Sequence, residues 1–180
     1  MPSRWVVATV VGGVALRVID AADIALLDAR AVAHVAFTAG GTAVGSGGPL
    51  EREAAAATLS KDLMDGLRDR ARRGLTVTAV AESEDGVIAV GSYQPVGELA
   101  EIVAVATLPA RRLRGVGGAV TALLAQHARS QGVRTMLLSA QNEDVARIYR
   151  RIGFRQVGST CAAQRPSTEA SDQGQGLPGS

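Results

Sequence analysis

The residues best suited to chemistry form a basic, glycine-rich stretch, residues 112–118 (RLRGVGG). An apolar run, Ile102–Ala106, precedes this stretch and is closed by Pro109. Apolar residues at helical spacing follow it from Val116 to Ala128, and they predict an amphipathic helix. A strand that passes through glycines into a helix leaves backbone N–H groups free at the positive end of the helix dipole. The stretch therefore predicts a phosphate-binding turn.

Two common phosphate motifs do not fit this stretch. A Walker loop requires Gly-Lys-Ser/Thr, and the single lysine, Lys61, lies outside any such pattern. A dinucleotide fingerprint, G-x-G-x-x-G, requires a third glycine where this chain has Val120, and the acidic residue expected about twenty positions later is missing. The pattern that remains is R/Q-x-x-G-x-G/A, which is matched by Arg112, Gly115 and Gly117.

This remaining pattern resembles the pyrophosphate-binding motif of the GNAT superfamily, the acyl-CoA-dependent N-acyltransferases. A later stretch, Ala146–Phe154, resembles the second signature of that family, A-x-x-x-Y-x-x-x-G-F. Together they cover about residues 98–160 in the family's order of strand, loop, helix, strand, helix and strand. The first 75 residues carry no recognised motif, and in this family that part usually varies with the substrate. The resemblance implies a mixed α/β sheet with antiparallel N-terminal strands, splayed central strands and flanking helices.

The resemblance also implies which residues hold acetyl-CoA, the acyl donor. Backbone N–H groups of the turn would hold the pyrophosphate without a metal, and glycines would let the backbone approach it. The strand before the turn would pair with the pantetheine arm. The implied coenzyme-binding residues are Val105, Ala106, Thr107, Leu108, Arg112, Leu113, Arg114, Gly115, Val116, Gly117, Gly118, Ala119 and Asn142. The alternative for Arg111, Arg112 and Arg114 is a solvated turn in an arginine-rich chain.

Asn142 marks a departure from the family pattern. Many members have an asparagine three residues before the alanine of the second signature, where this chain has Glu143. Asn142 is one residue earlier, and it could reach the coenzyme or cap the following helix. Glu143 beside phosphates would be mildly unfavourable unless it points away.

By resemblance, Tyr149 is the general acid. A phenol with an ordinary pKa of about 10 can protonate or hydrogen-bond a departing thiolate. The alternative is an aromatic residue on the buried stripe of a helix, because Val145, Ile148 and Ile152 share its face.

Glu101 is the candidate base that removes a proton from the attacking amine. It lies eleven residues before Arg112, within an Ala-Glu-Ile-Val run like that around the glutamate base of histone-acetylating family members. At the edge of an apolar strand, partial desolvation would raise the pKa of this carboxyl above about 4.3. Two alternatives for the base remain open, Glu98 and a chain of waters. Glu101 itself could instead be a strand-end carboxylate in solvent with no catalytic role.

These roles predict an enzyme that moves an acetyl group from acetyl-CoA directly to a primary amine, with no covalent intermediate and no metal. The acceptor is a small-molecule or peptide amine, and because family members often pair, a homodimer is possible. A non-catalytic acyl-CoA-binding module is the alternative, although retention of Tyr149 and Glu101 favours the enzyme. A DNA-binding protein using residues 112–129 is a third hypothesis, weakened by the few charges past Arg114.

Charge and cysteine content exclude other classes. The net charge of +2 is too small to indicate a nucleic-acid partner. Cys161 is the only cysteine, which excludes an internal disulfide and a multi-thiolate metal site. The run Trp5–Leu16 is too short to span a bilayer and predicts a strand rather than a targeting segment, so a cytoplasmic protein without a membrane partner is expected. His34 and His127 have no partner at ligand spacing, and structural roles are expected for both.

The elements that must position these residues follow from periodicity and turn chemistry. One or two strands are predicted in 5–19, a helix over 21–36, a flexible glycine-rich loop over 39–49 and a helix over 51–73. Strands over 75–81 and 87–94 form a hairpin, followed by a strand over 98–107, a helix to about 131, a strand over 134–140, a helix over 145–152 and a strand over 154–162. A single domain, 1–163, has its core in 75–163, and a disordered tail covers 164–180.

Overall fold

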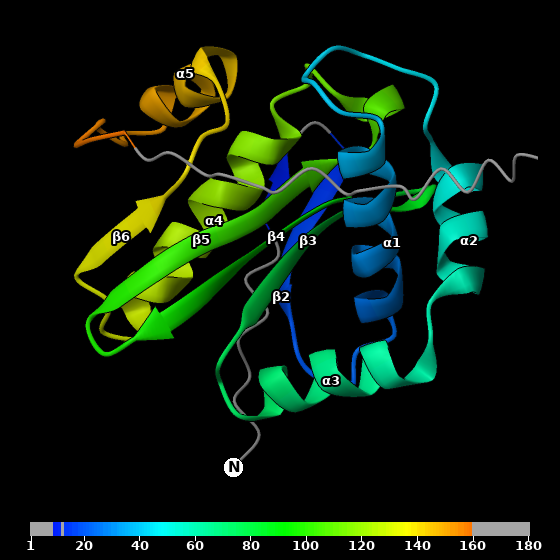
Figure 1. Ribbon diagram of the computed structural model, residues 1–180, viewed down its shortest axis with the longest axis horizontal. Helices are drawn as coiled ribbons and strands as arrows, with labels where there is room; N and C mark the ends of the chain where they lie inside the picture. Colours follow the sequence, from blue (N-terminus) through cyan, green and yellow to red (C-terminus); the bar gives the residue numbers. More distant parts are fainter. Residues whose placement is uncertain (1–8, 12, 160–180) are drawn as a thin grey trace, which may run out of the picture.

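The computed structural model describes residues 9–11 and 13–159, and its six-stranded sheet follows chain order (Figure 1). The strands are β1 (Thr9–Val11), β2 (Val14–Ile19), β3 (Val77–Ser83), β4 (Gly86–Val96), β5 (Leu99–Thr107) and β6 (Thr135–Leu138). Neighbouring strands are antiparallel from β1 to β5, whereas β6 runs parallel to β5. A parallel step requires a crossover, which a helix supplies here. The predicted mixed α/β sheet is confirmed.

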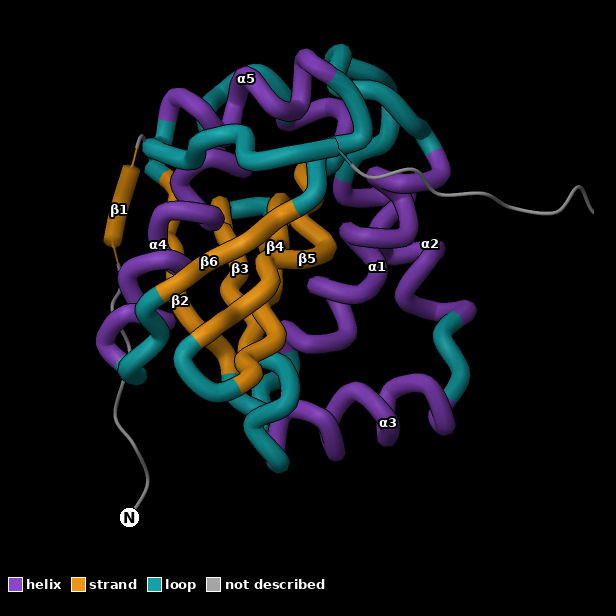
Figure 2. Tube along the Cα trace, turned by 60° about the vertical axis from the view of Figure 1, so that its left-hand side comes forward, coloured by secondary structure: helices purple, strands orange, loops and turns teal. Residues whose placement is uncertain are grey.

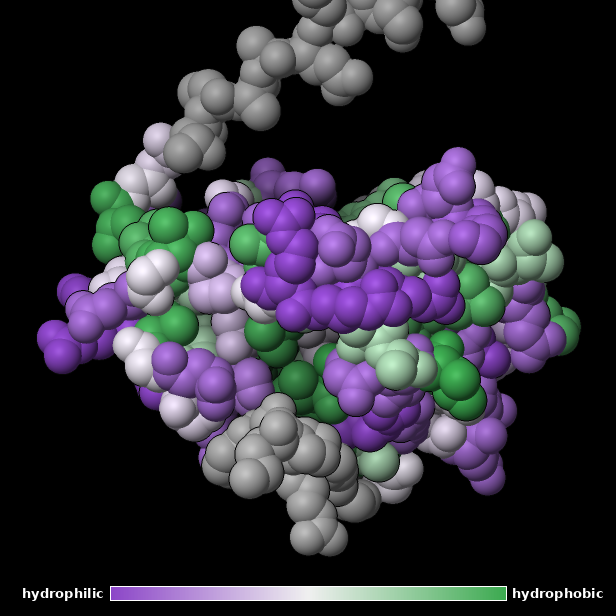
Figure 3. Space-filling model, turned by 90° about the horizontal axis from the view of Figure 1, so that it is seen from below, coloured by the Kyte–Doolittle hydropathy of each residue, from purple (hydrophilic) through white to green (hydrophobic). Residues whose placement is uncertain are grey.

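Helices cover both faces of this sheet, and in Figure 2 the strands lie between α1 and α4. The helices are α1 (Ala25–Thr38), α2 (Pro49–Thr58), α3 (Lys61–Arg72), α4 (Val116–Ser130) and α5 (Glu143–Arg151), with a 3-10 helix, η1 (Pro109–Arg111). α1 packs against β4 and β5, and α4 packs against β2 to β5. From the side of α3, the surface is mainly hydrophilic (Figure 3).

A glycine in β4 lets α4 lie close to the sheet. A Cβ atom at Gly91 would lie 2.9 Å from Leu124 Cδ1 and 3.0 Å from Val120 Cγ1. Leu124 and Val120 are themselves fully buried. Since aromatic residues make up only 3% of the chain, close packing of aliphatic side chains such as these fills the interior.

The helix predicted over 51–73 is wrong in its continuity, since the chain forms α2 and α3 with a break at Leu59 and Ser60. Leu59 is extended, with φ −71° and ψ 127°, and the Ser60 hydroxyl accepts a hydrogen bond from the N–H of Leu63 at 3.3 Å. Serine is a preferred residue before the first turn of a helix, so Ser60 begins a new helix instead of continuing the old one.

The strand predicted over 154–162 is wrong for its described part, because residues 154–159 form no strand. Residues 155–159 are exposed, so a strand there would bury no apolar face. The remainder of that prediction, Cys161 and the predicted tail from residue 164 lie outside the described residues.

A polar pair connects the middle of β4 to the C-terminal half of α4. The Tyr93 hydroxyl lies 2.9 Å from His127 Nδ1, and Tyr93 is buried. Burial lowers the pKa of His127 below its ordinary value of 6.5 and raises the pKa of Tyr93. The predicted structural role of His127 fits this pairing.

We expect His127→Gln to reduce the loss of stability on acidification. The folded chain resists protonation of His127, so stability present above pH 6.5 is lost as the pH falls toward the lowered pKa. The midpoint temperature of thermal unfolding should fall less for the variant than for the wild type when the pH is lowered from 7 to 5. His34→Gln, at an exposed position of α1, is the matched control. Equal falls in all three proteins would contradict the prediction.

Candidate functional site

The central feature of the site is a split between β5 and β6. The two strands pair over four residues, from Leu99 with Thr135 to Ile102 with Leu138, where β6 ends. Within the described residues, 103–107 of β5 therefore have no strand partner on that side, and Figure 1 shows β6 diverging from β5. Unpaired backbone N–H and C=O groups at such an edge can bind an extended, amide-containing molecule.

A bulge in β5 sets which side chains line this split. Val90 pairs with Ala106 and Ser92 with Val103, so β5 has one more residue than β4 between the two pairs. Ala104 takes up the extra residue with φ 54°. Beyond it, Val105 and Thr107 face α4, as their contacts with Gly117 show below.

The turn after β5 presents free backbone N–H groups, as the sequence predicts. Gly115 precedes α4 with φ 75°, in the left-handed region that glycine adopts without strain. α4 begins at Val116, so the N–H groups of its first turn have no carbonyl partner within the helix. These donors stand at the positive end of the helix dipole.

Different requirements explain the two glycines of the motif. A Cβ at Gly115 would meet no atom within 4 Å, so its positive φ, rather than close approach, requires glycine there. A Cβ at Gly117 would lie 3.3 Å from Thr107 Oγ1 and 3.9 Å from Val105 Cγ1. Gly117 therefore keeps the space between α4 and β5 open.

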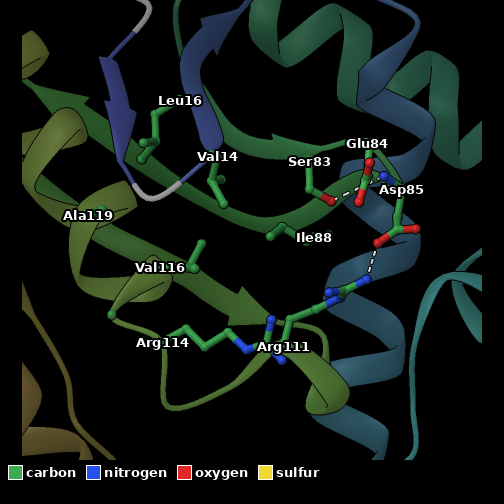
Figure 4. Close-up of a pocket in the computed structure, with 12 residues that line it drawn as sticks. Val14, Leu16, Ser83, Glu84, Asp85, Ile88, Arg111, Arg114, Val116 and Ala119 are labelled. Atoms are coloured by element: carbon green, nitrogen blue, oxygen red, sulfur yellow. Dashed lines mark hydrogen bonds and ion pairs between the residues drawn. The ribbon is translucent and has the colours of Figure 1, made fainter.

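The three arginines of the turn have different surroundings. The Arg112 guanidinium donates to the carbonyls of Ala36, Gly40 and Ala43, which lie 69 to 76 positions earlier in the chain. Arg111 forms an ion pair with Asp85 in the β3–β4 hairpin (Figure 4). Arg114 is exposed and has no ion pair among the described residues.

A cavity of about 460 Å³ lies on the flank of α4 away from the split. Figure 4 shows Arg111 and Arg114 at one end of this cavity and the β3–β4 hairpin at another. Apolar side chains of β2 and α4, including Leu16 and Val116, also line it. The cavity thus borders the same turn from the opposite side.

The second signature forms α5, which lies beside the N-terminal end of α4 (Figure 1). A Cβ at Gly118 would lie 3.8 Å from Ile152 Cγ2. The Asn142 side chain accepts from the N–H of Val145 at 3.0 Å, so it caps α5. Glu143 forms an ion pair with Arg150 of the same helix.

Tyr149 is half-buried on α5, a helix with no fully buried side chain. Its ring meets that of Phe154 edge to face, with centroids 6.2 Å apart. Burial raises the pKa of Tyr149 above its ordinary value of 10.0, so the phenol keeps its proton through the neutral range. Tyr149 is therefore a protonated phenol on a helix that lies outside the main core.

Glu101 lies on the other face of the sheet. It pairs with Gln94 across β4 and with Leu137 across β6, one residue before the split opens. The neighbouring pair, Tyr93 and Ile102, faces α4, so Glu101 faces the side of α1. Its side chain is exposed at this point of the strand. Glu98, the alternative base, pairs with Arg134 at 3.3 Å.

Neither a metal cluster nor a membrane-crossing helix is found in the part of the chain that the structure describes. There, no three His, Cys, Asp or Glu side chains gather to hold a metal ion. None of the described helices has the length and apolar character that a bilayer crossing requires.

Sequence reasoning missed two features of the site. The bulge at Ala104 carries no glycine signal, and the tethering of Arg112 joins residues more than 70 positions apart. The run of glycines in 39–49 was the one sequence signal for this tethering. Glycine is required where the backbone of a loop packs closely against another segment, as well as where a loop is flexible.

Comparison with known proteins agrees with this fold. A sequence model of the acetyltransferase (GNAT) family matches residues 49–154. No curated protein sequence matches the chain.

Solved structures share the fold at low sequence identity. A Trypanosoma brucei acetyltransferase has 21% identity and a TM-score of 0.59, over 84% of this chain and 99% of that one. A predicted acetyltransferase with acetyl-CoA from Clostridium acetobutylicum has 17% identity and a TM-score of 0.57, over 84% and 96%. Glucosamine-6-phosphate N-acetyltransferase from Arabidopsis thaliana has 16% identity and a TM-score of 0.57, over 83% and 97%.

Proposed function

The chain belongs to the acetyltransferase (GNAT) family, and we propose that it transfers an acetyl group from acetyl-CoA to a primary amine by direct attack in a ternary complex. The split between β5 and β6 carries this proposal, because the unpaired edge of β5 leads directly into the turn whose N–H groups begin α4. The helix α5, which carries the half-buried Tyr149, approaches Gly118 of α4 through Ile152. The similar fold of a structure with acetyl-CoA supports the choice of donor.

The turn of residues 112–118 would hold the pyrophosphate of acetyl-CoA. Free N–H groups at the start of α4 would donate to its oxygens, and the open space beside Gly117 leaves room for it. Arg114, exposed at the turn, would add charge. The unpaired edge from Val105 to Thr107 would hydrogen-bond the amides of the pantetheine arm. The N–H of Leu108, which the sequence also suggested for this role, donates instead to the carbonyl of Ile88 at 2.9 Å.

Arg112 and Asn142 enter this proposal in changed roles. The guanidinium of Arg112 is engaged by backbone carbonyls, so its part in coenzyme binding would be indirect. The Asn142 side chain caps α5 and would help to fix the helix that carries Tyr149.

The catalytic groups would act from the two faces of the sheet. Glu101, on the α1 side, would accept a proton from the amine as the C–N bond forms. Tyr149, on the α4 side, would donate a proton to the sulfur as the C–S bond breaks. The acetyl amide and free coenzyme A are the products. Glu101 then releases its proton to water and Tyr149 takes one from water, so both groups return to their starting states.

Release of free thiol from acetyl-CoA tests the proposal. A panel of glucosamine 6-phosphate, spermidine and a lysine-containing peptide samples small-molecule and peptide amines. Thiol release that depends on one of these amines would support the enzyme. Coenzyme binding by calorimetry without thiol release would favour the alternative of a non-catalytic acyl-CoA-binding module. Absence of both signals would refute the proposal.

Glu101→Gln should lower kcat about 100-fold and remove the acidic limb of the pH–rate profile. The amide cannot accept a proton, whereas its size and position on β5 are unchanged. Glu98→Gln is the matched control, because Glu98 lies three residues away and pairs with Arg134. An acidic limb that persists in Glu101→Gln but disappears in Glu98→Gln would transfer the role to Glu98.

A further inference from the structure

We propose that Arg112 is a positioning residue that fastens the loop between α1 and α2 to the turn before α4. On the proposed function, that loop belongs to the acceptor side and the turn to the coenzyme side. Arg112 would then order the two sides as one unit.

The contacts of Arg112 span three points of one segment. Nη1 donates to the carbonyls of Gly40 at 2.8 Å and Ala43 at 3.1 Å, and Nη2 donates to the carbonyl of Ala36 at 2.9 Å. The planar, forked guanidinium suits such multiple acceptors, which a single ammonium group would satisfy less well.

Arg112 supplies a hydrogen-bond donor and a positive charge to the C-terminal end of α1. The last carbonyls of a helix lack partners inside it, and they form the negative end of the helix dipole. The last turn of α1 contains no basic residue. Arg112, from a distant part of the chain, supplies the positive charge and the donor to Ala36.

The rest of the loop is docked onto η1, immediately before Arg112. The N–H of Gly45 donates to the carbonyl of Pro109 at 3.1 Å, and the N–H of Ala110 donates to the carbonyl of Gly47 at 2.9 Å. A Cβ at Gly47 would lie 3.0 Å from Val35 Cγ1 and 3.1 Å from Pro109 Cγ. The expected flexible loop is therefore held by backbone bonds, close packing and Arg112.

This arrangement has a mechanical consequence. The chain runs directly from Arg112 into the turn that presents its N–H groups at the start of α4. A ligand that orders the turn also fixes the backbone of Arg112, and through its guanidinium the loop of residues 39–48. Coenzyme binding should thus slow local opening of the loop of residues 39–48.

Hydrogen exchange tests this coupling without an acceptor. In the ligand-free protein, Arg112→Gln should raise the exchange rate of residues 39–48 about tenfold or more, because three hydrogen bonds to a charged group are lost. Saturating coenzyme A should slow exchange of 39–48 in the wild type but not in Arg112→Gln. Coenzyme A should still protect residues 113–118 in both proteins. Arg112→Lys should recover part of the loop protection.

Two variants make the result specific. Arg129→Gln removes an exposed arginine from the last turn of α4 and should exchange like the wild type. Arg114→Gln should weaken coenzyme A binding while leaving ligand-free exchange of 39–48 unchanged. Thermal unfolding of each variant verifies that the fold is intact.

Different results overturn the two proposals. Wild-type exchange of residues 39–48 in Arg112→Gln, or loop protection by coenzyme A that persists in this variant, would overturn the positioning role. Failure of coenzyme A to protect residues 113–118 in the wild type would instead overturn the proposed function, whereas the ligand-free comparison would still measure the fastening.

Discussion

Replacing Gly117 with arginine should abolish binding of acetyl-CoA. Its Cβ alone would lie 3.3 Å from Thr107 Oγ1, and the rest of the side chain would occupy the space between α4 and β5. A displaced pyrophosphate would lose at least two charge-assisted hydrogen bonds, each worth about 1.5–3 kcal/mol, so affinity should fall about 100-fold or more. Isothermal titration calorimetry with acetyl-CoA measures this loss.

Two further variants separate volume from charge. Gly117→Leu fills the same space without adding charge and should lose affinity in the same way. Gln126→Arg adds the same side chain at an exposed position of α4 and should bind like the wild type. Wild-type affinity in Gly117→Arg, with an unchanged melting temperature, would remove the argument that this turn holds the pyrophosphate.

Tyr149→Phe should lower kcat about 100-fold while acetyl-CoA affinity changes no more than about threefold. The substitution removes the phenol oxygen and keeps the ring, which meets Phe154 edge to face. Because burial raises the pKa of Tyr149, the wild type holds the missing proton throughout the neutral range. The rate deficit should therefore be constant from pH 6 to pH 9.

The second tyrosine of the chain provides the control. Tyr93→Phe also removes a phenol oxygen, but one that bonds His127 in the interior. It should lower the melting temperature and leave kcat near that of the wild type. A wild-type kcat in Tyr149→Phe would exclude Tyr149 as the general acid.

Local chemistry made much of the site predictable. The left-handed residue before α4, the start of that helix at Val116 and the hairpin between β3 and β4 all follow from short stretches of sequence. Each depends on backbone preferences within a few residues, as glycine at a positive φ shows. The two signatures then place α5 beside α4 only through the family resemblance.

The rest of the site depends on contacts between distant residues. Arg112 reaches carbonyls 69 to 76 positions earlier, and Arg111 meets Asp85 across 26 positions. An arginine in a turn has the same sequence pattern whether its head group meets a phosphate, a carbonyl or water. The break at Ser60 was hidden for a different reason, because strong helix formers on both sides outweighed one capping residue.

The bulge in β5 limits which substitutions are tolerated at residue 104. In a regular strand without it, side chains alternate strictly, and Thr107 and Val105 would exchange places with Ala106 relative to α4. The Thr107 hydroxyl would then face the side of α1, and the methyl group of Ala106 would face α4. A β-branched residue at 104 would favour that regular strand, because it tolerates the left-handed conformation poorly. One small residue in the middle of β5 therefore decides which side chains line the edge of the split on the α4 side.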